Sequence, residues 1–248
     1  MKKPAKRATP REKSAGPAPM GVTGSEMEAR RAGRLITLEF LKTGRTPLQV
    51  CDVAGQAVAV ADAAIQSAVI ADPPRAASAC KEGCAWCCHK MVGTTVPEVL
   101  RIVAYLQEKL SAGETQALKD RVGQRHDQRK ALQAQGRFRA NLPCALLVDN
   151  RCSVYPVRPL TCRGFNSSDA RQCELSLDPR NHAAVPAYAP QQRLATLVLD
   201  GMRAGLVEAG LSGALVELTA ALHIALTIPE ALDQWRAGKA SFEAAHLP

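Results

Sequence analysis

The chain has 248 residues, of which 46% are apolar and only 4% aromatic, and its formal net charge is +9. A chain of this length can bury a core of its own, so its nine cysteines are not needed merely to staple a small fold together. Ala and Leu dominate over β-branched and aromatic residues, which favours a mainly α fold over a β fold.

The first thirteen residues carry six Lys or Arg against one Glu, a net charge of +5 that leaves 9 − 5 = +4 for the remainder. We expect residues 1–24 to form a disordered basic arm, because they have little apolar surface to bury. Such an arm is either a solvated tail, which we prefer, or a tether to nucleic acid or a membrane surface. No apolar run approaches the ~18 residues that span a bilayer, and no signal-like segment follows the lysines. We therefore expect a cytoplasmic protein that makes no use of a membrane.

The remaining residues, 25–248, are expected to form a single helical domain. A helix from about Met27 to Lys42 and one over 47–71 follow from apolar periodicity and proline stops. The sequence Thr95-Val96-Pro97-Glu98 is a capping box that opens the next helix. A polar helix over 114–135 should face solvent or cover the site, and its basic side chains are expected to form an ordinary solvated face. The last predicted helices cover about 191–210 and 213–227, with a short one opened by Pro229.

Four cysteines fall within nine residues. Cys80, Cys84, Cys87 and Cys88 have the spacing C-x3-C-x2-C-C, and Gly83 gives the backbone freedom to fold round an ion. Both iron–sulfur clusters and thiolate zinc sites use short cysteine runs, so the spacing indicates a metal without identifying it. Adjacent side chains point in different directions on a regular backbone, so Cys87 and Cys88 can serve different metal atoms.

The other clustered cysteines are more widely spaced. The intervals between Cys144, Cys152, Cys162 and Cys173 are seven, nine and ten residues, too wide for a simple CxxC knuckle. Short apolar stretches on either side of Asp149-Asn150 predict a small β-hairpin in this otherwise loop-rich region, with the first two of these cysteines at its ends. In a reducing compartment such cysteines indicate metal ligands or redox groups rather than disulfides.

The two cysteine motifs together resemble a known family. The run C-x3-C-x2-C-C, followed by P-C, a hairpin turn and C-x-V-Y-x-x-R-P-x-x-C-R, is similar to the cysteine-cluster proteins of the YkgJ type, described as a CxxCxxCC zinc- or iron-chelating domain. The resemblance covers about residues 80–173. It implies that these cysteines chelate metal, and a related flagellin lysine methylase holds an iron–sulfur cluster. Cys173 fits the pattern more loosely than the other seven. Asn150 stands where the family often has glycine, which asparagine can replace in the left-handed conformation.

Four further residues invite a role. Cys51 stands alone on an apolar helix and is expected to be a small core residue. His89 could replace a cysteine as ligand, although enough thiolates are present without it. Trp86 is expected to shield the site from solvent. Arg163, beside Cys162, is either a cofactor-binding residue that offsets the negative charge of a thiolate-bound centre or an ordinary surface cation.

Three functions compete at this point. The first is a metal-binding protein whose eight cysteines hold an iron–sulfur cluster, such as a 4Fe–4S cluster, or zinc, and we prefer the cluster. The second is a structural zinc module that binds protein or, through the basic arm, nucleic acid; the scarcity of aromatic residues speaks against it. The third is an iron–sulfur enzyme of redox or methyl-transfer chemistry. A radical S-adenosylmethionine enzyme is disfavoured, because its repeated strand–helix units are missing.

Overall fold

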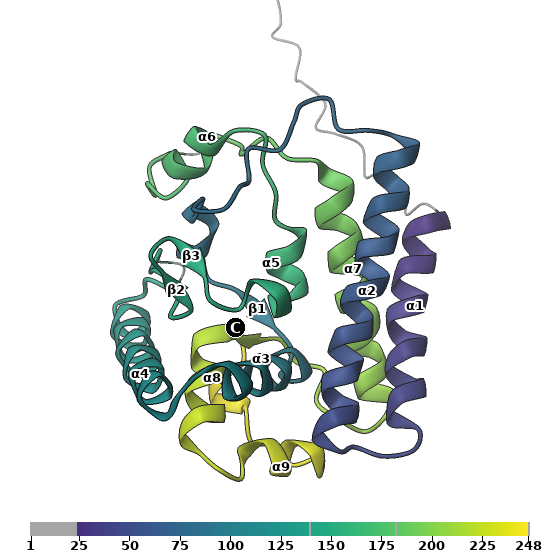
Figure 1. Cartoon of the computed structure of the whole chain (residues 1–248), viewed down its shortest axis with the longest axis vertical. Helices are drawn as coiled ribbons and strands as arrows, with labels where there is room; N and C mark the ends of the chain where they lie inside the picture. Colours follow the sequence, from purple (N-terminus) through teal and green to yellow (C-terminus); the bar gives the residue numbers. More distant parts are fainter. Residues whose placement is uncertain (1–23, 139, 182, 248) are drawn as a thin grey trace, which may run out of the picture.

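The computed structural model describes residues 24–138, 140–181 and 183–247. Residues 1–23 of the expected basic arm lie outside the described residues. Within the described part the chain forms nine α-helices and two antiparallel two-stranded sheets, which confirms the mainly α fold. Three long helices, α1 (Gly24–Leu41), α2 (Pro47–Ala71) and α7 (Ala189–Glu208), pack side by side and make one side of the molecule (Figure 1).

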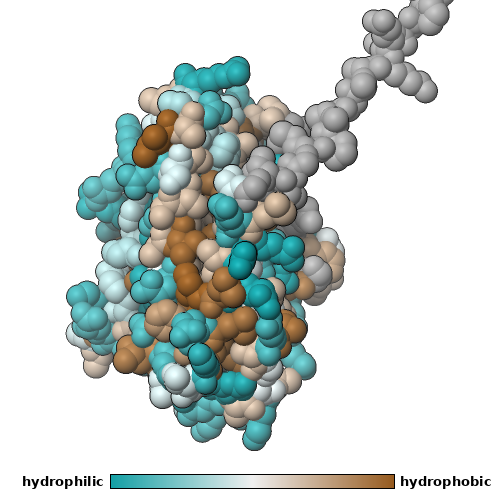
Figure 2. Space-filling view, turned by 90° about the vertical axis from the view of Figure 1, so that its right-hand side faces the viewer, coloured by the Kyte–Doolittle hydropathy of each residue, from teal (hydrophilic) through white to brown (hydrophobic). Residues whose placement is uncertain are grey.

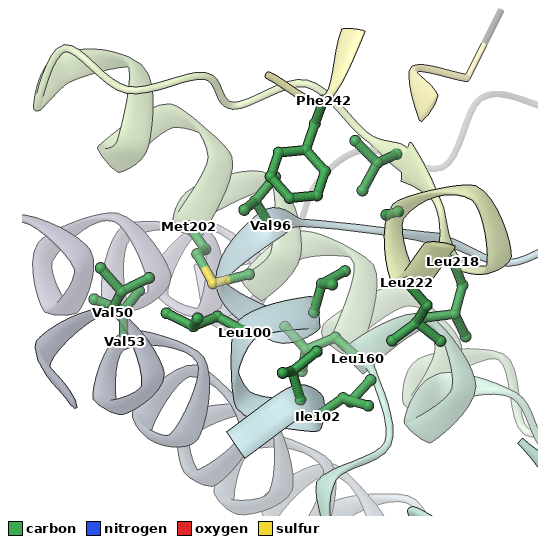
Figure 3. Packing of buried hydrophobic residues seen from close by; sticks show 14 of the residues in the cluster. Val50, Val53, Val96, Leu100, Ile102, Leu160, Met202, Leu218, Leu222 and Phe242 are labelled. Atoms are coloured by element: carbon green, nitrogen blue, oxygen red, sulfur yellow. The ribbon is translucent and has the colours of Figure 1, made fainter. Parts of the chain in front are cut away.

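The other side is built from shorter elements that carry the cysteines. Helix α3 (Val96–Lys109) packs against α2 and α8 (Leu218–Thr227), and α4 (Ala112–Ala134) packs against α8 (Figure 1). Helix α9 (Ala231–Arg236) follows α8. One continuous core joins the two sides, with side chains from α2, α3, α7 and α8 interdigitating (Figure 3). The fully buried residues at this junction include Val50, Val53, Ile102, Met202 and Leu222.

Helices α1 and α7 approach so closely that only glycine fits at their crossing. A Cβ on Gly201 would overlap the carbonyl oxygen of Arg30, and one on Gly205 would lie 2.8 Å from the carbonyl oxygen of Arg34. Gly33 of α1 faces the backbone of α7 in the same way. The side chains that elsewhere separate two helices are absent here, so the two backbones are in direct contact.

The predicted capping box at the start of α3 is present, and the structure adds a second one at the start of α2. Helix α2 begins behind Thr46, which exchanges bonds with Gln49, and α3 begins behind Thr95, which pairs with Glu98. Glu98 is only 3% exposed and does more than cap its own helix: its Oε1 accepts a 2.7 Å bond from the backbone N–H of Leu160. It therefore fastens the start of α3 to the start of α5 (Leu160–Gly164).

The predicted hairpin is also confirmed. Strand β2 (Leu147–Val148) pairs with β3 (Arg151–Cys152) in the register Leu147 to Cys152. Asp149 and Asn150 between them have φ values of 49° and 59°, the left-handed pair that a tight two-residue hairpin turn requires. Gly83 has a φ of 83°, in keeping with the freedom expected of it.

The structure departs from the sequence prediction in several places. A second small sheet pairs β1 (Gly93–Thr94) with β4 (Val216–Glu217), so the helix predicted from 213 begins only at Leu218. Two short helices, α5 and α6 (Ala170–Leu175), interrupt the stretch predicted as loop. Runs of two to six residues are too short for periodicity to reveal.

The basic face of α4 is not simply solvated, contrary to expectation. Arg129 is 5% exposed and donates to the carbonyl of Ala140 at 2.8 Å. Arg121 donates from Nε to the carbonyl of Ala145 at 2.6 Å. Both bonds reach the loop that leads to the hairpin, so α4 holds this loop in place.

One expectation about hydropathy needs correction. Helix α2 is long and apolar enough to cross a bilayer by length and composition, although no such segment was expected. Its Ala-rich sequence raises the mean hydropathy, while Val50, Val53 and Ala57 face the core. Core helices of soluble proteins pass the same test, so composition alone does not place α2 in a membrane. The side of the molecule formed by α1 and α2 exposes apolar patches between polar ones (Figure 2); both helices expose large apolar side chains, among them Leu35 and Ile70.

Candidate metal centre

Three separate stretches of chain bring the eight predicted ligands into one region. The loop after α2, including a 3₁₀ helix at Trp86–His89, carries the C-x3-C-x2-C-C run; the hairpin region and α5 carry the next three cysteines; α6 carries the last. All nine cysteines are free thiols. The predicted ligands are Cys80, Cys84, Cys87, Cys88, Cys144, Cys152, Cys162 and Cys173.

Backbone hydrogen bonds connect the loop after α2 to the hairpin region. The N–H of Cys144 donates to the carbonyl of Cys88 at 2.7 Å, and that of Leu142 donates to the carbonyl of His89 at 2.9 Å. The hairpin continues the arrangement, because the N–H of Ser153 donates to the carbonyl of Leu146 at 2.9 Å. Residues about 55 positions apart in the sequence are therefore neighbours.

The segment that contains α6 is hydrogen-bonded to both ends of the first cysteine run. The N–H of Ala79 donates to the carbonyl of Ser167 at 2.8 Å. The ammonium group of Lys90 donates to the carbonyl of Ser176 at 3.1 Å. Helix α6 lies against the 3₁₀ helix. These contacts hold the segment that leads into and out of α6 beside both ends of the cysteine run.

Burial acts strongly on the thiols of Cys144 and Cys162, and Cys173 is the cysteine with the least exposed surface, at 7%. Burial raises the pKa of Cys144 to about 11, and the charges of Cys152 and Glu217 add to the rise. Burial also raises the pKa of Cys162 well above its ordinary value, with Cys144, Cys152 and Cys87 contributing. Mutual effects of this kind require the thiols to lie near one another. As free thiols they stay protonated at neutral pH.

Cys87 and Cys88 form a coupled pair. A hydrogen bond between the two thiols lowers the pKa of Cys87 to about 7 and raises that of Cys88. Burial and the neighbouring Cys144 and Cys152 contribute further to the rise at Cys88. Of the two, Cys87 is therefore the thiol that ionises more readily, and thiolate is the form that binds metal.

Cys80 and Cys173 both lie near Ser167. The thiol of Cys80, which is exposed, donates to the carbonyl of Ser167 at 3.8 Å. Burial raises the pKa of Cys173, a hydrogen bond with the Ser167 side chain opposes the rise, and the charges of Cys80, Cys84 and Cys87 add to it. Cys84 is half-buried.

Arg158 and Arg121, rather than the expected Arg163, are the cations whose charges lower the pKa values of clustered thiols. Arg163 forms an ion pair with Asp62 of α2 at 3.0 Å. The guanidinium of Arg158 stacks 3.9 Å above the ring of Tyr155, and its buried Nε has no hydrogen-bond partner in the described part of the chain. After the stronger effects of hydrogen bonding and burial, its positive charge lowers the pKa of Cys87. The proposed role of Arg163 at the cofactor stays a prediction.

The remaining candidates have structural surroundings. Cys51 is half-buried on α2 and packs against the core. His89 places Nδ1 3.1 Å from the carbonyl oxygen of Ala85, which leaves only its other ring nitrogen for a ligand. The half-buried Trp86 lies near His89, with ring centroids 6.5 Å apart.

The donor set fits a thiophilic metal, since three stretches that are hydrogen-bonded to one another carry eight thiols into the same region. Within residues 24–138, 140–181 and 183–247, no three His, Cys, Asp or Glu side chains are drawn together tightly enough to hold an ion as they stand. Binding therefore requires the thiols to lose their protons and to close round the metal.

Sequence reasoning missed the groups that support this region. Glu98, Glu217 and Arg121 come from elements outside the cysteine motifs; Glu98 was assigned to a cap, Arg121 to a solvated face, and Glu217 to no role. The capping box was the only signal at Glu98, and it gave no indication that the second carboxylate oxygen reaches Leu160. Partners so distant in sequence leave no local pattern.

Comparison with known proteins supports the metal assignment. Residues 79–182 match a family model described as CxxCxxCC, putative zinc- or iron-chelating domain. The match confirms the resemblance drawn from the cysteine spacing, and it contains all eight clustered cysteines. Searches of curated proteins and of solved structures found no match. The segment is thus similar to a metal-binding domain, with zinc and iron as the metals concerned.

Proposed function

We propose that this chain, whose residues 79–182 match the CxxCxxCC domain, is a cytoplasmic metal-binding protein that holds an iron–sulfur centre through its clustered cysteines. The observation that carries the proposal is that three stretches, hydrogen-bonded to one another, carry eight free thiols. A single zinc ion takes four ligands, so eight thiols exceed what one structural zinc site uses. The cytoplasm keeps such thiols reduced.

The chain's own residues would perform distinct tasks. The cysteines bind the metal as thiolates, which requires each to release its proton. Burial disfavours this ionisation, while the positive charge of Arg158 favours it at Cys87. The loop over 140–146, held by Arg121 and Arg129, keeps Cys144 beside Cys88. When bound, an iron–sulfur centre supplies electron-transfer or Lewis-acid chemistry to whatever reaction the protein serves.

Purification without oxygen tests the identity of the metal. We expect brown protein with a broad absorption near ~400 nm and comparable amounts of iron and sulfide. Exposure to air should bleach the colour, and zinc can then occupy the emptied thiolates, so only the anaerobic sample is decisive. Colourless anaerobic protein with stoichiometric zinc and no sulfide would establish the zinc form instead.

Two serine variants locate the centre. Cys162→Ser removes a deeply buried thiol and should lower the bound metal, because a hydroxyl is a much weaker ligand than a thiolate. Cys51→Ser is the matched control: it changes a half-buried cysteine outside the cluster and should retain full metal content. Full metal in both variants would place the centre elsewhere.

A further inference from the structure

We propose that the stacked imidazole rings of His126 and His223 form a pH-sensitive contact between α4 and α8, and that acid opens this contact and releases the loop over 140–146, which carries Cys144. The inference concerns the conformation of the chain itself. Its consequence for bound metal, which is easier loss in mild acid, rests on the proposed function.

The two rings lie face to face between the helices. Their centroids are 4.4 Å apart, and their planes are inclined by only 11°. His126 belongs to α4 and His223 to α8, and these two helices pack against each other. His126 follows the buried Val122 by four residues, so both lie on the same face of α4. The histidine pair is therefore part of the contact between the two helices.

The surroundings of the pair suit the neutral form of histidine. The Nδ1 atom of each ring is buried and has no hydrogen-bond partner in the part of the chain that the structure describes. A neutral ring can keep its proton on Nε2 and leave Nδ1 as a lone pair, whereas an imidazolium ion carries a proton on both nitrogens. Protonation of the pair would place N–H groups at buried points without an acceptor and would bring two positive charges face to face.

The charged groups around His126 also disfavour its protonation. Burial lowers the pKa of His126, and the charges of His223 from α8 and Lys130 from α4 lower it further, whereas Asp127 of α4 opposes them. The imidazole therefore takes up a proton more readily in water, where its pKa is about 6.5, than when it is packed against α8. The contact is at full strength above pH ~6.5 and weakens as the pH falls below this value.

Helix α4 connects the histidine pair to the cysteine region. Arg129, about one turn beyond the ring, donates to the carbonyl of Ala140 at 2.8 Å, and Arg121 donates to the carbonyl of Ala145 at 2.6 Å. These bonds fix both ends of the loop that carries Cys144. When the second half of α4 leaves α8, the bond from Arg129 is lost and the loop is held at one end only.

Hydrogen–deuterium exchange of the reduced, metal-free full chain tests the inference at pH 7.5 and 5.5, with each rate divided by that of an unstructured peptide at the same pH. One proton taken up on opening raises the opening constant by at most about tenfold per pH unit. We expect the protection of the second half of α4 and of residues 140–146 to fall several-fold in acid. Exchange in both segments should be faster than in α7 at either pH, which marks a local opening rather than global unfolding.

Two variants separate the histidine pair from other effects of pH. His126→Phe keeps a flat ring that can stack on His223 but cannot be charged, so most of the acid-induced loss of protection should disappear. His246→Gln is the matched control, because His246 is an exposed histidine that is not part of the stacked pair, and it should respond as the wild type does. Far-ultraviolet circular dichroism checks the fold. If His126→Phe does not fold, His223→Phe decides in the same way.

An equal loss of protection in the wild type and in the folded phenylalanine variant would overturn the inference, as would exchange over 140–146 that is no faster than in α7. The zinc-loaded chain supplies a second measurement. The pH at which half of the zinc is released should be lower in His126→Phe than in the wild type, and equal values would contradict the link to metal. A chain that binds neither zinc nor iron would refute the proposed function, while the exchange measurement would still decide whether the histidine contact responds to pH.

Discussion

Replacing Glu98 by Gln tests whether a buried carboxylate holds the cysteine region to the helical core. One oxygen of Glu98, Oε2, accepts from the hydroxyl of Thr94 at 2.8 Å and from the N–H and hydroxyl of Thr95, each at 2.9 Å. The other, Oε1, accepts only from the N–H of Leu160, at 2.7 Å. Glutamine keeps one acceptor oxygen, which should bond to the three donors of Thr94 and Thr95. Its NH₂ group then faces the N–H of Leu160, and two donors cannot bond to each other.

The cost follows from the bond that is lost. A buried donor left without a partner costs about 1–3 kcal/mol, and hydrogen bonds to a charged group are worth about 1.5–3 kcal/mol. We therefore expect Glu98→Gln to lower the free energy of unfolding by about 2 kcal/mol, and Glu98→Ala, which frees all the donors, by about 4 kcal/mol. For a chain of this length, 2 kcal/mol corresponds to a fall in Tm of about 4–8 °C.

Urea unfolding followed by circular dichroism measures these differences. The matched control is Glu114→Gln in the exposed capping box of α4, where Ser111 and solvent share the bonding; we expect a loss of less than about 1 kcal/mol there. A Glu98→Gln variant as stable as the wild type, or no less stable than Glu114→Gln, would refute the reasoning that the link to Leu160 supports the fold.

Three further outcomes are expected. Gly201→Ala should cost at least about 1–3 kcal/mol in urea unfolding because its methyl group meets the backbone of α1, whereas Gly123→Ala on open helix surface should be neutral or stabilising. Burial and the charge of His223 lower the pKa of His126 in the folded chain. As the pH falls, the imidazole of His126 is therefore protonated in the unfolded chain before it is protonated in the folded chain. The free energy of unfolding should decrease below pH ~6.5, and it should decrease less steeply in His126→Gln. If urea unfolding shows the same loss of stability between pH 7 and pH 5.5 in the wild type and in His126→Gln, the prediction is wrong. Deletion of residues 2–20 removes no cysteine, so metal content by elemental analysis should be unchanged.

Local signals in the sequence were sufficient for the long elements. Helix α2 begins at the predicted residue 47, α3 begins at the predicted capping box, and the left-handed pair Asp149-Asn150 closes the predicted hairpin. Each of these features depends on residues within a few positions of one another, which a sequence records directly.

The supporting contacts of the site could not be predicted in the same way. Arg158 and Arg163 looked alike in the sequence, and their roles separate only because Asp62 of α2 pairs with Arg163 while Arg158 stacks on Tyr155. The gathering of Cys80 and Cys173 around Ser167 likewise depends on how α6 folds back on the cysteine run. Such choices are made by packing between distant segments, and local patterns do not contain them.

The native mass spectrum of the anaerobically purified chain tests the central claim most directly, because it weighs the folded protein together with whatever it binds. We predict a mass above the 26.5 kDa of the polypeptide by the mass of bound metal, and of sulfide for the iron–sulfur form. The excess should persist in Cys51→Ser and diminish in Cys162→Ser. A mass equal to that of the polypeptide alone, or an excess that both variants retain in full, would contradict metal binding by the clustered cysteines.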